Sequence, residues 1–338
     1  MSRPQVVNVD CNFVYDVERR QIEAAGGELV LRRASTEDEI VAACTDATVV
    51  LLEFPHTPLT ARVIAALPAC RAIVRYGVGI ESVDQAEATR RGVVVANTAD
   101  FCTEEVSDHA AALLLASARK ICFFDRKIRS GGWQDFKLSP PLRRMSSMTL
   151  GLVGWGRIAQ AVARKMQGFG LRILVTDPFV RSMPPGSPVE LVGMDRLLRE
   201  SDLVSLHLPL TPETKHLIGE DALRAMKPTA FLVNTSRGGV VDQPALVRTL
   251  EENRLGGAAL DVFEEEPLPA DSPLRSMDQV VMTPHYAASS LDSMAHLHRT
   301  VADSVEAILR GFWPPFPVNA GVQPRDPLRP WSEFRPRG

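Results

Sequence analysis

The amino-acid sequence lacks the features of exported, membrane-spanning and disulfide-bonded proteins. Its apolar runs, such as residues 110–116, are far shorter than the ~20 residues that a membrane-spanning helix needs. The first residues contain no apolar core of a signal peptide. The five cysteines are odd in number and form no C-x-x-C pair, which argues against a disulfide framework or a zinc site. We therefore expect a cytoplasmic protein that binds no metal.

A strong charge of one sign is also missing, because 38 basic residues face 41 acidic ones and leave a net charge of −3. Without an overall positive field, neither nucleic acid nor an anionic membrane is an expected partner. The composition, 45% hydrophobic and 23% charged, is that of a globular protein rather than a disordered one. The length of 338 residues fits two domains at ~150 residues each.

Short apolar runs rich in β-branched residues alternate with segments of helical period, first over about residues 6–96 and again after residue 149. This alternation predicts βαβ units and parallel sheets. The expected strands are 6–9, 48–52, 72–74, 93–96, 150–153, 172–176, 203–206, 230–233, 257–260 and 280–282. The helices expected beside them are 17–25, 36–43, 60–66, 82–90, 158–167, 194–200, 222–226 and 243–253.

Two longer helices are expected outside these series. One covers residues 103–130, and its run 110–116 is apolar nearly all round, which indicates burial on more than one side or a subunit interface. The other covers residues 289–309, has no strand after it, and would pack back on the first series. Seven prolines follow within residues 312–338, and their density forbids regular structure.

The strongest local motif is a glycine-rich turn between an expected strand and an expected helix, where Gly154, Gly156 and Ala159 form a G-x-G-x-x-A pattern. The first glycine permits a tight turn, the second lets the backbone approach a pyrophosphate, and the alanine allows close packing of helix on sheet. Asp177 ends the next strand, where an acid binds the ribose hydroxyls of NAD and repels the 2′-phosphate of NADP. Alone, Asp177 is equally a turn residue before Pro178, but with the glycines it indicates NAD.

Three polar features follow later strands, and each has an ordinary alternative. Arg237 stands in a tight turn, an acidic run occupies residues 261–266, and His285 follows the last strand. Individually they can be a surface ion pair, a solvated loop and a helix-entry residue. They are nevertheless expected at the carboxyl ends of parallel strands, where open α/β sheets bind ligands.

Together these residue types suit hydride transfer between a 2-hydroxy acid and a nicotinamide. Histidine can carry the hydroxyl proton because its pKa of ~6.5 lies near working pH. A neighbouring carboxylate orients the ring and favours imidazolium. Arginine supplies a permanent charge and a planar fork that matches a substrate carboxylate.

The motifs resemble those of the D-isomer-specific 2-hydroxyacid dehydrogenases over about residues 51–305. This resemblance implies two Rossmann-like, doubly wound, parallel-sheet α/β domains, with the substrate-binding domain split around the NAD-binding domain. It also implies NAD-dependent interconversion of a D-2-hydroxy acid and its 2-oxo acid. The motifs are the glycine turn, Asp177, Asn234-Thr-Ser-Arg237-Gly, Asp261-Val-Phe-Glu-Glu-Glu266-Pro and Thr283-Pro-His285.

We accordingly divide the chain into three parts. Residues 1–102 and 289–322 are assigned to the discontinuous substrate-binding domain, and residues 103–288 to the NAD-binding domain. Residues 323–338, rich in proline and arginine, are expected to form a disordered tail.

The resemblance implies roles for individual residues. Arg237 would bind the substrate carboxylate and carbonyl, His285 would be the acid/base, and Glu266 would pair with His285. The loop Arg75-Tyr76-Gly77-Val78-Gly79 would bind the substrate carboxylate. The residues expected to contact NAD are Thr103, Gly154, Gly156, Arg157, Ile158, Asp177, His207, Thr235, Ser236, Asp261 and Ala288. The histidines assigned to surface or core are His56, His109, His216, His296 and His298.

Two departures from the family pattern bear on the substrate. Phe54-Pro55-His56 stands where phosphoglycerate dehydrogenases usually carry arginine for the phosphate, which makes phosphoglycerate a less favoured substrate. Tyr286-Ala287-Ala288 replaces the usual small residues after the histidine, so we expect a differently shaped pocket near the nicotinamide.

Two other functions stay open. The C-terminal-binding-protein corepressors are similar around residues 73–75 and keep the same arginine, glutamate and histidine, so an NAD(H)-sensing regulator with little turnover is the main alternative. Against it, Ala288 replaces the tryptophan of those proteins. Oxidation of a small inorganic or one-carbon anion is the second alternative. The apolar helix at 103–130 and the family together predict a homodimer.

Overall fold

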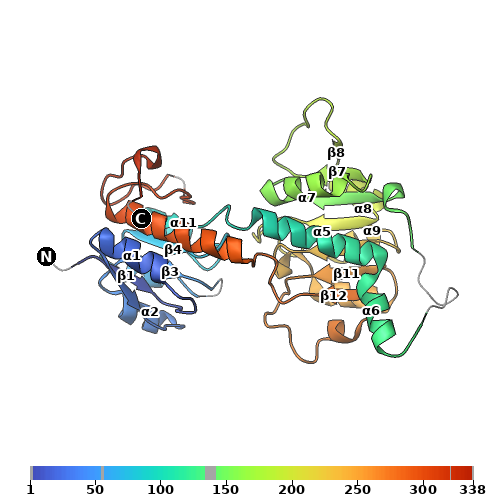
Figure 1. The fold of residues 1–338 in the computed structure, drawn as a ribbon, viewed down its shortest axis with the longest axis horizontal. Coiled ribbons are helices and arrows are strands. Elements are labelled where there is room, and N and C mark those ends of the chain that lie inside the picture. The colour runs from blue at the N-terminus through green and yellow to red at the C-terminus, as the bar shows by residue number, and fades with distance from the viewer. Residues whose placement is uncertain (1–2, 55–56, 134–141, 320, 337–338) are drawn as a thin grey trace. The chain divides into compact units, whose positions relative to one another are not determined.

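The computed structural model describes residues 3–54, 57–133, 142–319 and 321–336. The chain forms two compact units: unit 1 comprises Met1–Phe101 and Ser290–Gly338, and unit 2 comprises Cys102–Ser289 (Figure 1). Both units are parallel-sheet α/β structures, which confirms the expected fold class. Among the described residues, the helices are all too short or too polar to cross a membrane.

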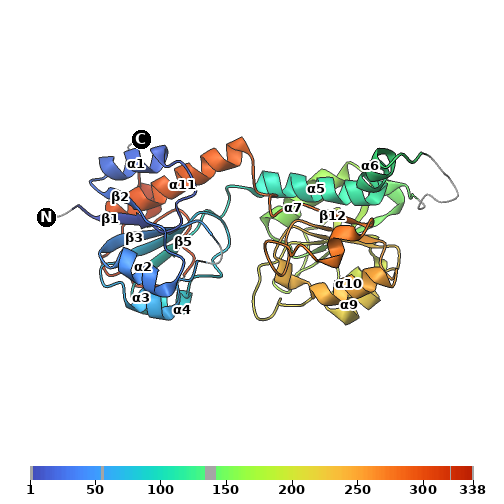
Figure 2. The ribbon, with the colours of Figure 1, turned by 90° about the horizontal axis from the view of Figure 1, so that it is seen from below.

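Unit 1 contains a five-stranded sheet in the order β2-β1-β3-β4-β5, the flavodoxin-like order of a doubly wound fold. Figure 2 shows helices α1 and α11 on one face of this sheet and α2, α3 and α4 on the other. Because both faces are covered, the inner strands are almost entirely apolar. The elements are β1 (Gln5–Asn8), α1 (Asp16–Ala24), β2 (Glu28–Leu31), α2 (Glu37–Cys44), β3 (Ala47–Leu52), α3 (Ala61–Ala65), β4 (Ala72–Arg75), α4 (Gln85–Arg90), β5 (Val94–Ala96) and α11 (Leu291–Leu309).

Unit 2 contains a seven-stranded sheet in the order β12-β11-β10-β9-β6-β7-β8, with all neighbours parallel. The first strand of the unit, β6, lies in the middle of this sheet. Strands β7 and β8 are added on one side of β6, and β9 to β12 on the other. The strand order therefore reverses between β6 and β9, which is where doubly wound folds bind ligands. Its helices are α5 (Thr103–Arg119), α6 (Ile121–Arg129), α7 (Arg157–Gln167), α8 (Met194–Glu200), α9 (Glu220–Ala225) and α10 (Gln243–Glu251). Its strands are β6 (Thr149–Val153), β7 (Arg172–Thr176), β8 (Val189–Leu191), β9 (Leu203–Leu206), β10 (Phe231–Asn234), β11 (Gly257–Leu260) and β12 (Val280–Met282).

Side-chain caps fix where several helices begin. The Asp242 carboxylate accepts a 2.9 Å hydrogen bond from the Ala245 N–H and caps α10, whose first turn contains Pro244. Ser290 and Ser293 bond reciprocally at the start of α11. These caps satisfy backbone N–H groups that a helix leaves without partners at its first turn.

The expected single helix at 103–130 is wrong, because the chain breaks it at Lys120. The backbone of Lys120 has φ 52°, in the left-handed region, and separates α5 from α6.

The strands β2 and β8 were not expected from the sequence. Both lie at sheet edges and carry an acid, Glu28 or Glu190, so neither shows the continuous apolar run of the inner strands.

The C-terminal tail is packed on unit 1, and the expectation of disorder is wrong for residues 323–336. Phe334 is only 3% exposed, and its ring lies 4.7 Å from that of Trp331 and 5.5 Å from that of Phe312. Arg329 lies 3.7 Å over the Phe312 ring, and its N–H bonds to the carbonyl of Gly311 at 2.9 Å. Proline prevents regular structure here, but aromatic side chains still bury against the end of α11.

Replacing Phe334 with alanine should reduce the free energy of unfolding by roughly 3 kcal/mol, the loss expected for a buried phenylalanine. Urea unfolding followed by fluorescence and circular dichroism measures this change. Ser332→Ala, at an exposed neighbouring position, is the matched control and should unfold like the parent protein. Equal stabilities for the two variants would contradict the packed tail.

Candidate active site

The carboxyl ends of the unit 2 strands bring together most residues singled out in the sequence. Because the strands are parallel, every loop that follows a strand emerges at the same edge of the sheet. The residues at this edge are Gly154 and Gly156 after β6, Asp177 after β7, His207 after β9, Thr235, Ser236 and Arg237 after β10, Asp261 and Glu266 after β11, and His285 after β12.

The glycine turn has the shape of a dinucleotide cradle. Gly154 has φ +94°, and a Cβ there would lie 2.4 Å from the carbonyl oxygen of His207, so a larger residue is excluded. At Gly156 a Cβ would meet no atom within 4 Å among the described residues, which leaves the space above the turn open. Gly156 is also the N-cap of α7 and has no side chain to occupy the first N–H groups of the helix. The turn therefore fits a pyrophosphate bound at a helix N-terminus.

Asp177 is held beside this turn by backbone hydrogen bonds. Its carboxylate accepts 2.8 Å bonds from the N–H groups of Trp155 and Phe179. The first bond ties the end of β7 to the glycine turn, and the second closes the turn after Asp177. A fixed negative charge thus lies next to the cradle.

His207 and Thr235 lie on the neighbouring strand ends. Burial lowers the pKa of His207 to about 4, so the ring is neutral at pH 7, and its Nε2 lies 3.0 Å from Ser205 Oγ. Thr235 is 8% exposed, and its buried Oγ1 finds no hydrogen-bond partner in the described part of the chain. Because a buried hydroxyl without a partner is costly, this atom fits a polar group of a bound ligand.

The side chain of Asn234 folds the turn that carries Arg237. Its Oδ1 accepts from the N–H and Oγ of Ser236 at 3.0 and 2.8 Å, and its Nδ2 donates to the Arg237 carbonyl at 2.9 Å. The Arg237 guanidinium itself donates to the Ser236 carbonyl at 2.7 Å. The turn is therefore closed from both sides, and the arginine is fixed at the end of β10.

His285 and Glu266 form an imidazole–carboxylate pair, with Nδ1 2.7 Å from Oε2. The other oxygen, Oε1, accepts a 2.9 Å bond from the Phe263 N–H. Burial by itself would raise the pKa of Glu266, but hydrogen bonds from His285 and Phe263 and the positive charges of His285 and Arg237 outweigh it and lower the pKa. The side chains are 41% and 33% exposed, so the pair remains accessible to a ligand.

Asp261 organises the turn that carries His285. Its buried carboxylate accepts from Thr283 Oγ1 at 2.5 Å and from the N–H groups of Tyr286 and Ala287 at 2.9 and 3.0 Å. Its carbonyl oxygen accepts from the His285 N–H at 2.7 Å. Through these four hydrogen bonds, Asp261 holds together the turn at residues 283–287, here called the histidine turn.

One contact in this network was missed from the sequence. His109, assigned there to surface or core, lies on α5 with Nε2 2.9 Å from Thr283 Oγ1 and 3.6 Å from the Asp261 carboxylate. No local pattern marks this histidine, because its partners are more than 150 residues away in sequence. His56, assigned in the same way, lies outside the described residues.

The remaining expected site residues lie on other segments of the chain. Thr103 begins α5, Arg157 and Ile158 begin α7, and Ala288 follows the histidine turn. The expected substrate loop, residues 75–79, belongs to unit 1 and follows β4.

The substrate loop is held by its own hydrogen bonds within unit 1. The Gly77 N–H donates to Thr98 Oγ1 at 2.8 Å, and Asn97 Nδ2 donates to the Val78 carbonyl at 2.7 Å. The hydroxyl of buried Tyr76 donates to Glu18 Oε1 at 2.8 Å. Gly77 has φ +132°, which only glycine adopts readily, so the loop conformation is specific to this sequence.

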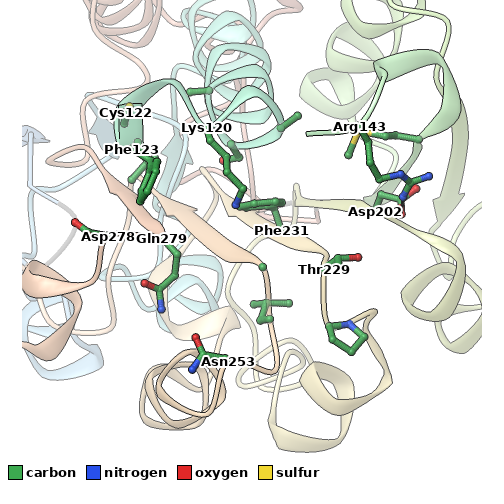
Figure 3. Close-up of a pocket in the computed structure, with 18 residues that line it drawn as sticks. Lys120, Cys122, Phe123, Arg143, Asp202, Thr229, Phe231, Asn253, Asp278 and Gln279 are labelled. Carbon is green, nitrogen blue, oxygen red and sulfur yellow. Dashed lines mark hydrogen bonds and ion pairs between the residues drawn. The ribbon is translucent and has the colours of Figure 1, made fainter. Parts of the chain in front are cut away.

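A cavity of about 450 Å³ lies at the opposite edge of the unit 2 sheet, away from these residues. Figure 3 shows Lys120, from the α5–α6 junction, extending over Phe231, with the ammonium 4.5 Å from the ring centroid. Residues such as Thr229 and Gln279, which precede β10 and β12, line the rest. The cavity is therefore separate from the cluster formed by Arg237, Glu266 and His285.

Comparison with known proteins identifies close relatives. Residues 111–287 match the family model described as "D-isomer specific 2-hydroxyacid dehydrogenase, NAD binding domain". A glyoxylate reductase of Korarchaeum cryptofilum is 43% identical over 300 residues, 87% of this chain and 86% of the relative. A D-3-phosphoglycerate dehydrogenase of Mycobacterium leprae is 37% identical over 319 residues, 93% of this chain but 59% of the relative.

Solved structures agree with this result. The crystal structure of a glyoxylate reductase from Paecilomyes thermophila has a TM-score of 0.85 against this chain at 25% identity. The match covers 94% of this chain and 99% of the reductase chain. An NADPH-dependent glyoxylate/hydroxypyruvate reductase from Sinorhizobium meliloti, solved with NADP and malonate, has a TM-score of 0.81 at 28% identity and covers 97% and 100%.

Proposed function

This chain belongs to the D-isomer specific 2-hydroxyacid dehydrogenase family and is an NAD(P)-dependent enzyme of that class, and we propose that it interconverts a D-2-hydroxy acid and its 2-oxo acid through Arg237, Glu266 and His285. The observation that carries this proposal is the His285–Glu266 pair beside the Arg237 turn, at the same sheet edge as the glycine turn. In this proposal His285 carries the proton, Glu266 orients the His285 ring, and Arg237 binds the carboxylate of the substrate.

The pair gives His285 the properties of a general acid. Because Glu266 binds Nδ1, the other ring nitrogen, Nε2, is left to donate its proton to the carbonyl oxygen of a 2-oxo acid. A nicotinamide cofactor held by the glycine turn and Asp177 would supply the hydride for the carbonyl carbon. Glu266 stabilises the imidazolium before the transfer, and Arg237 binds the substrate carboxylate and polarises the carbonyl. In the oxidative direction the neutral histidine accepts the same proton.

We assign the cofactor preference to NAD rather than NADP. The support is the fixed Asp177 carboxylate beside the glycine turn, which can accept the ribose hydroxyls and repels an additional phosphate. Solved structures similar to this chain hold NAD in one case and NADP in another, so our assignment is based on Asp177 and not on the fold.

The substrate preference follows from the relatives and the sequence together. This chain covers 86% of the length of the glyoxylate reductase of Korarchaeum cryptofilum. It covers only 54% and 59% of the length of two D-3-phosphoglycerate dehydrogenases. We infer a small 2-oxo acid without a phosphate. A panel of glyoxylate, hydroxypyruvate, phosphohydroxypyruvate and branched and aromatic 2-oxo acids, assayed with NADH, tests this inference. Tight NADH binding with negligible turnover of all of them would favour the regulatory alternative.

We also propose that the enzyme is a homodimer that associates through α6. None of the described residues of this helix is buried, and Ile121 and Ile128 are 55% and 49% exposed. The helix adjoins the apolar cavity of Figure 3, to which Cys122 and Phe123 contribute. A second copy of the chain would cover these side chains and bury apolar surface that is otherwise in water.

Replacing His285 with asparagine should reduce kcat by 10²–10⁴-fold, the usual effect of removing a general acid. Asparagine is chosen because position 285 has φ 53°, which asparagine tolerates better than most residues. The dissociation constant for NADH, measured by fluorescence, should stay unchanged. His296→Asn on α11 is the matched control, and near-full turnover by the His285 variant would exclude it as the proton donor.

Replacing Asp177 with asparagine should reduce the preference for NADH over NADPH by about tenfold, since the charge that repels the extra phosphate is lost, corresponding to ~1.4 kcal/mol. The ratio of the two kcat/KM values measures this preference. Unchanged thermal unfolding would show that the turn is intact. A wild-type enzyme that prefers NADPH would overturn the assignment.

Replacing Ile128 with aspartate should convert a dimer into a monomer, because a charge in the centre of an apolar interface loses its hydration. Light scattering coupled to size exclusion measures the mass. Leu291→Asp places the same charge at another exposed aliphatic residue, at the start of α11 and outside α6, and should leave the mass unchanged. A monomeric wild-type protein would rule out the proposed interface.

A further inference from the structure

A second imidazole–carboxylate pair lies next to the first. His216 Nε2 contacts Glu264 Oε1, and the two side chains are 39% and 28% exposed. Glu264 stands two residues before Glu266 in the same loop. The proposed reaction does not use His216, and its side chain has no other described partner that would explain this position.

The backbone of His216 also contacts the loop that carries Arg237. Its N–H donates to the Gly239 carbonyl at 2.9 Å, and two residues later the Ile218 N–H donates to the Val240 carbonyl at 3.0 Å. The segment around His216 therefore runs alongside the turn after β10. One residue thus contacts the arginine loop with its backbone and the glutamate loop with its ring.

The two loops touch directly at Gly238. A Cβ at this position would lie 1.8 Å from the Phe263 carbonyl oxygen, so only glycine allows the two backbones to come this close. Phe263 is the residue whose N–H binds Glu266. A small separation of the loops would therefore shift the hydrogen bond that orients Glu266 towards His285.

Glu264 is anchored from a third side by the start of α10. Its Oε2 accepts from the Gln243 N–H at 3.2 Å, and its own N–H donates to Gln243 Oε1 at 3.2 Å. The carboxylate thus joins the His216 segment, the N-terminus of α10 and the acidic loop. Its negative charge near the first turn of a helix is favourable.

We propose that His216 and Glu264 form a clamp that presses the Arg237 loop against the Glu266 loop and so positions Glu266 for its bond to His285. His216 is a positioning residue, since it acts through Glu264 and not on the substrate. The catalytic consequence rests on the proposed function, whereas the closure of the two loops does not.

The clamp has a specific electrostatic consequence. The charged groups that act on Glu266 are His285 and Arg237, and the bond from Phe263 adds to their effect. If the loops separate, the Glu266 carboxylate lies less closely against the His285 ring and stabilises the imidazolium less. Reduction of a 2-oxo acid needs the protonated ring, so its rate falls as the pH rises. With the loops separated, this fall would begin at a lower pH. NADH binding at the glycine turn would not change.

The test compares His216→Ala with His216→Gln, whose amide can replace the ring nitrogen as a donor to Glu264. We expect kcat/KM for reduction to fall 10- to 100-fold in the alanine variant, as for small misplacements of catalytic groups, and its loss of rate with rising pH to begin at a lower pH than in the wild type. The glutamine variant should recover most of both. Glu264→Gln should behave like His216→Ala, and the double variant should add little, because both changes break one contact. His296→Ala is the control.

Hydrogen exchange of the folded protein tests the clamp without any turnover. Amides of residues 237–243 and 262–266 should exchange faster in His216→Ala and normally in His216→Gln, with residues 154–162 unchanged in both. If the wild type shows these protections but reduces no 2-oxo acid, the proposed function fails and the clamp stands. If turnover is normal and exchange and pH profile do not change in His216→Ala, the clamp is wrong.

Discussion

Parallel strand pairing is the constraint on which the rest of the structure depends. Every strand of the unit 2 sheet runs in the same direction, so each loop that follows a strand emerges at one edge. Arg237 and His285 are separated by almost 50 residues, yet β10, β11 and β12 are consecutive neighbours in the sheet. The positions of these side chains are set by the apolar strands beneath them. Chemistry at the edge therefore depends on packing in the core.

Buried polar side chains convert this common edge into defined turns. Asn234 and Asp261 each end or follow a strand, are almost completely buried, and use their side-chain atoms to bind the backbone of the next few residues. Burial of a carboxylate or amide is costly unless its hydrogen bonds are made, so these turns have few alternative conformations. The side chains of Arg237 and His285, to which we assign the reaction, are left partly exposed on these turns. This arrangement limits the loss of conformational freedom when a ligand binds.

The sequence predicts the inner strands and the site loops well because both carry strong local patterns. β7, β9, β11 and β12 begin and end where apolar runs predict, and the glycine turn lies between a strand and a helix as expected. The edge strands β2 and β8 escape prediction because one-sided burial weakens the apolar pattern. The break at Lys120 escapes it because no glycine or proline marks the left-handed residue. Packing of the tail depends on contacts between Phe312 and Phe334, which local pattern cannot show.

The acidic run at the end of β11 shows most clearly what tertiary structure adds to sequence. Glu264, Glu265 and Glu266 are chemically identical, and as a group they are equally consistent with a solvated loop. The turn directs Glu264 to His216 and Glu266 to His285, so two glutamates only two residues apart have different partners. The Phe263 N–H binds Glu266, while Gln243 binds Glu264, and these two bonds fix which oxygen faces which ring. Through Glu266 and Glu264, a single loop thereby connects His285 to the His216 segment and to the start of α10.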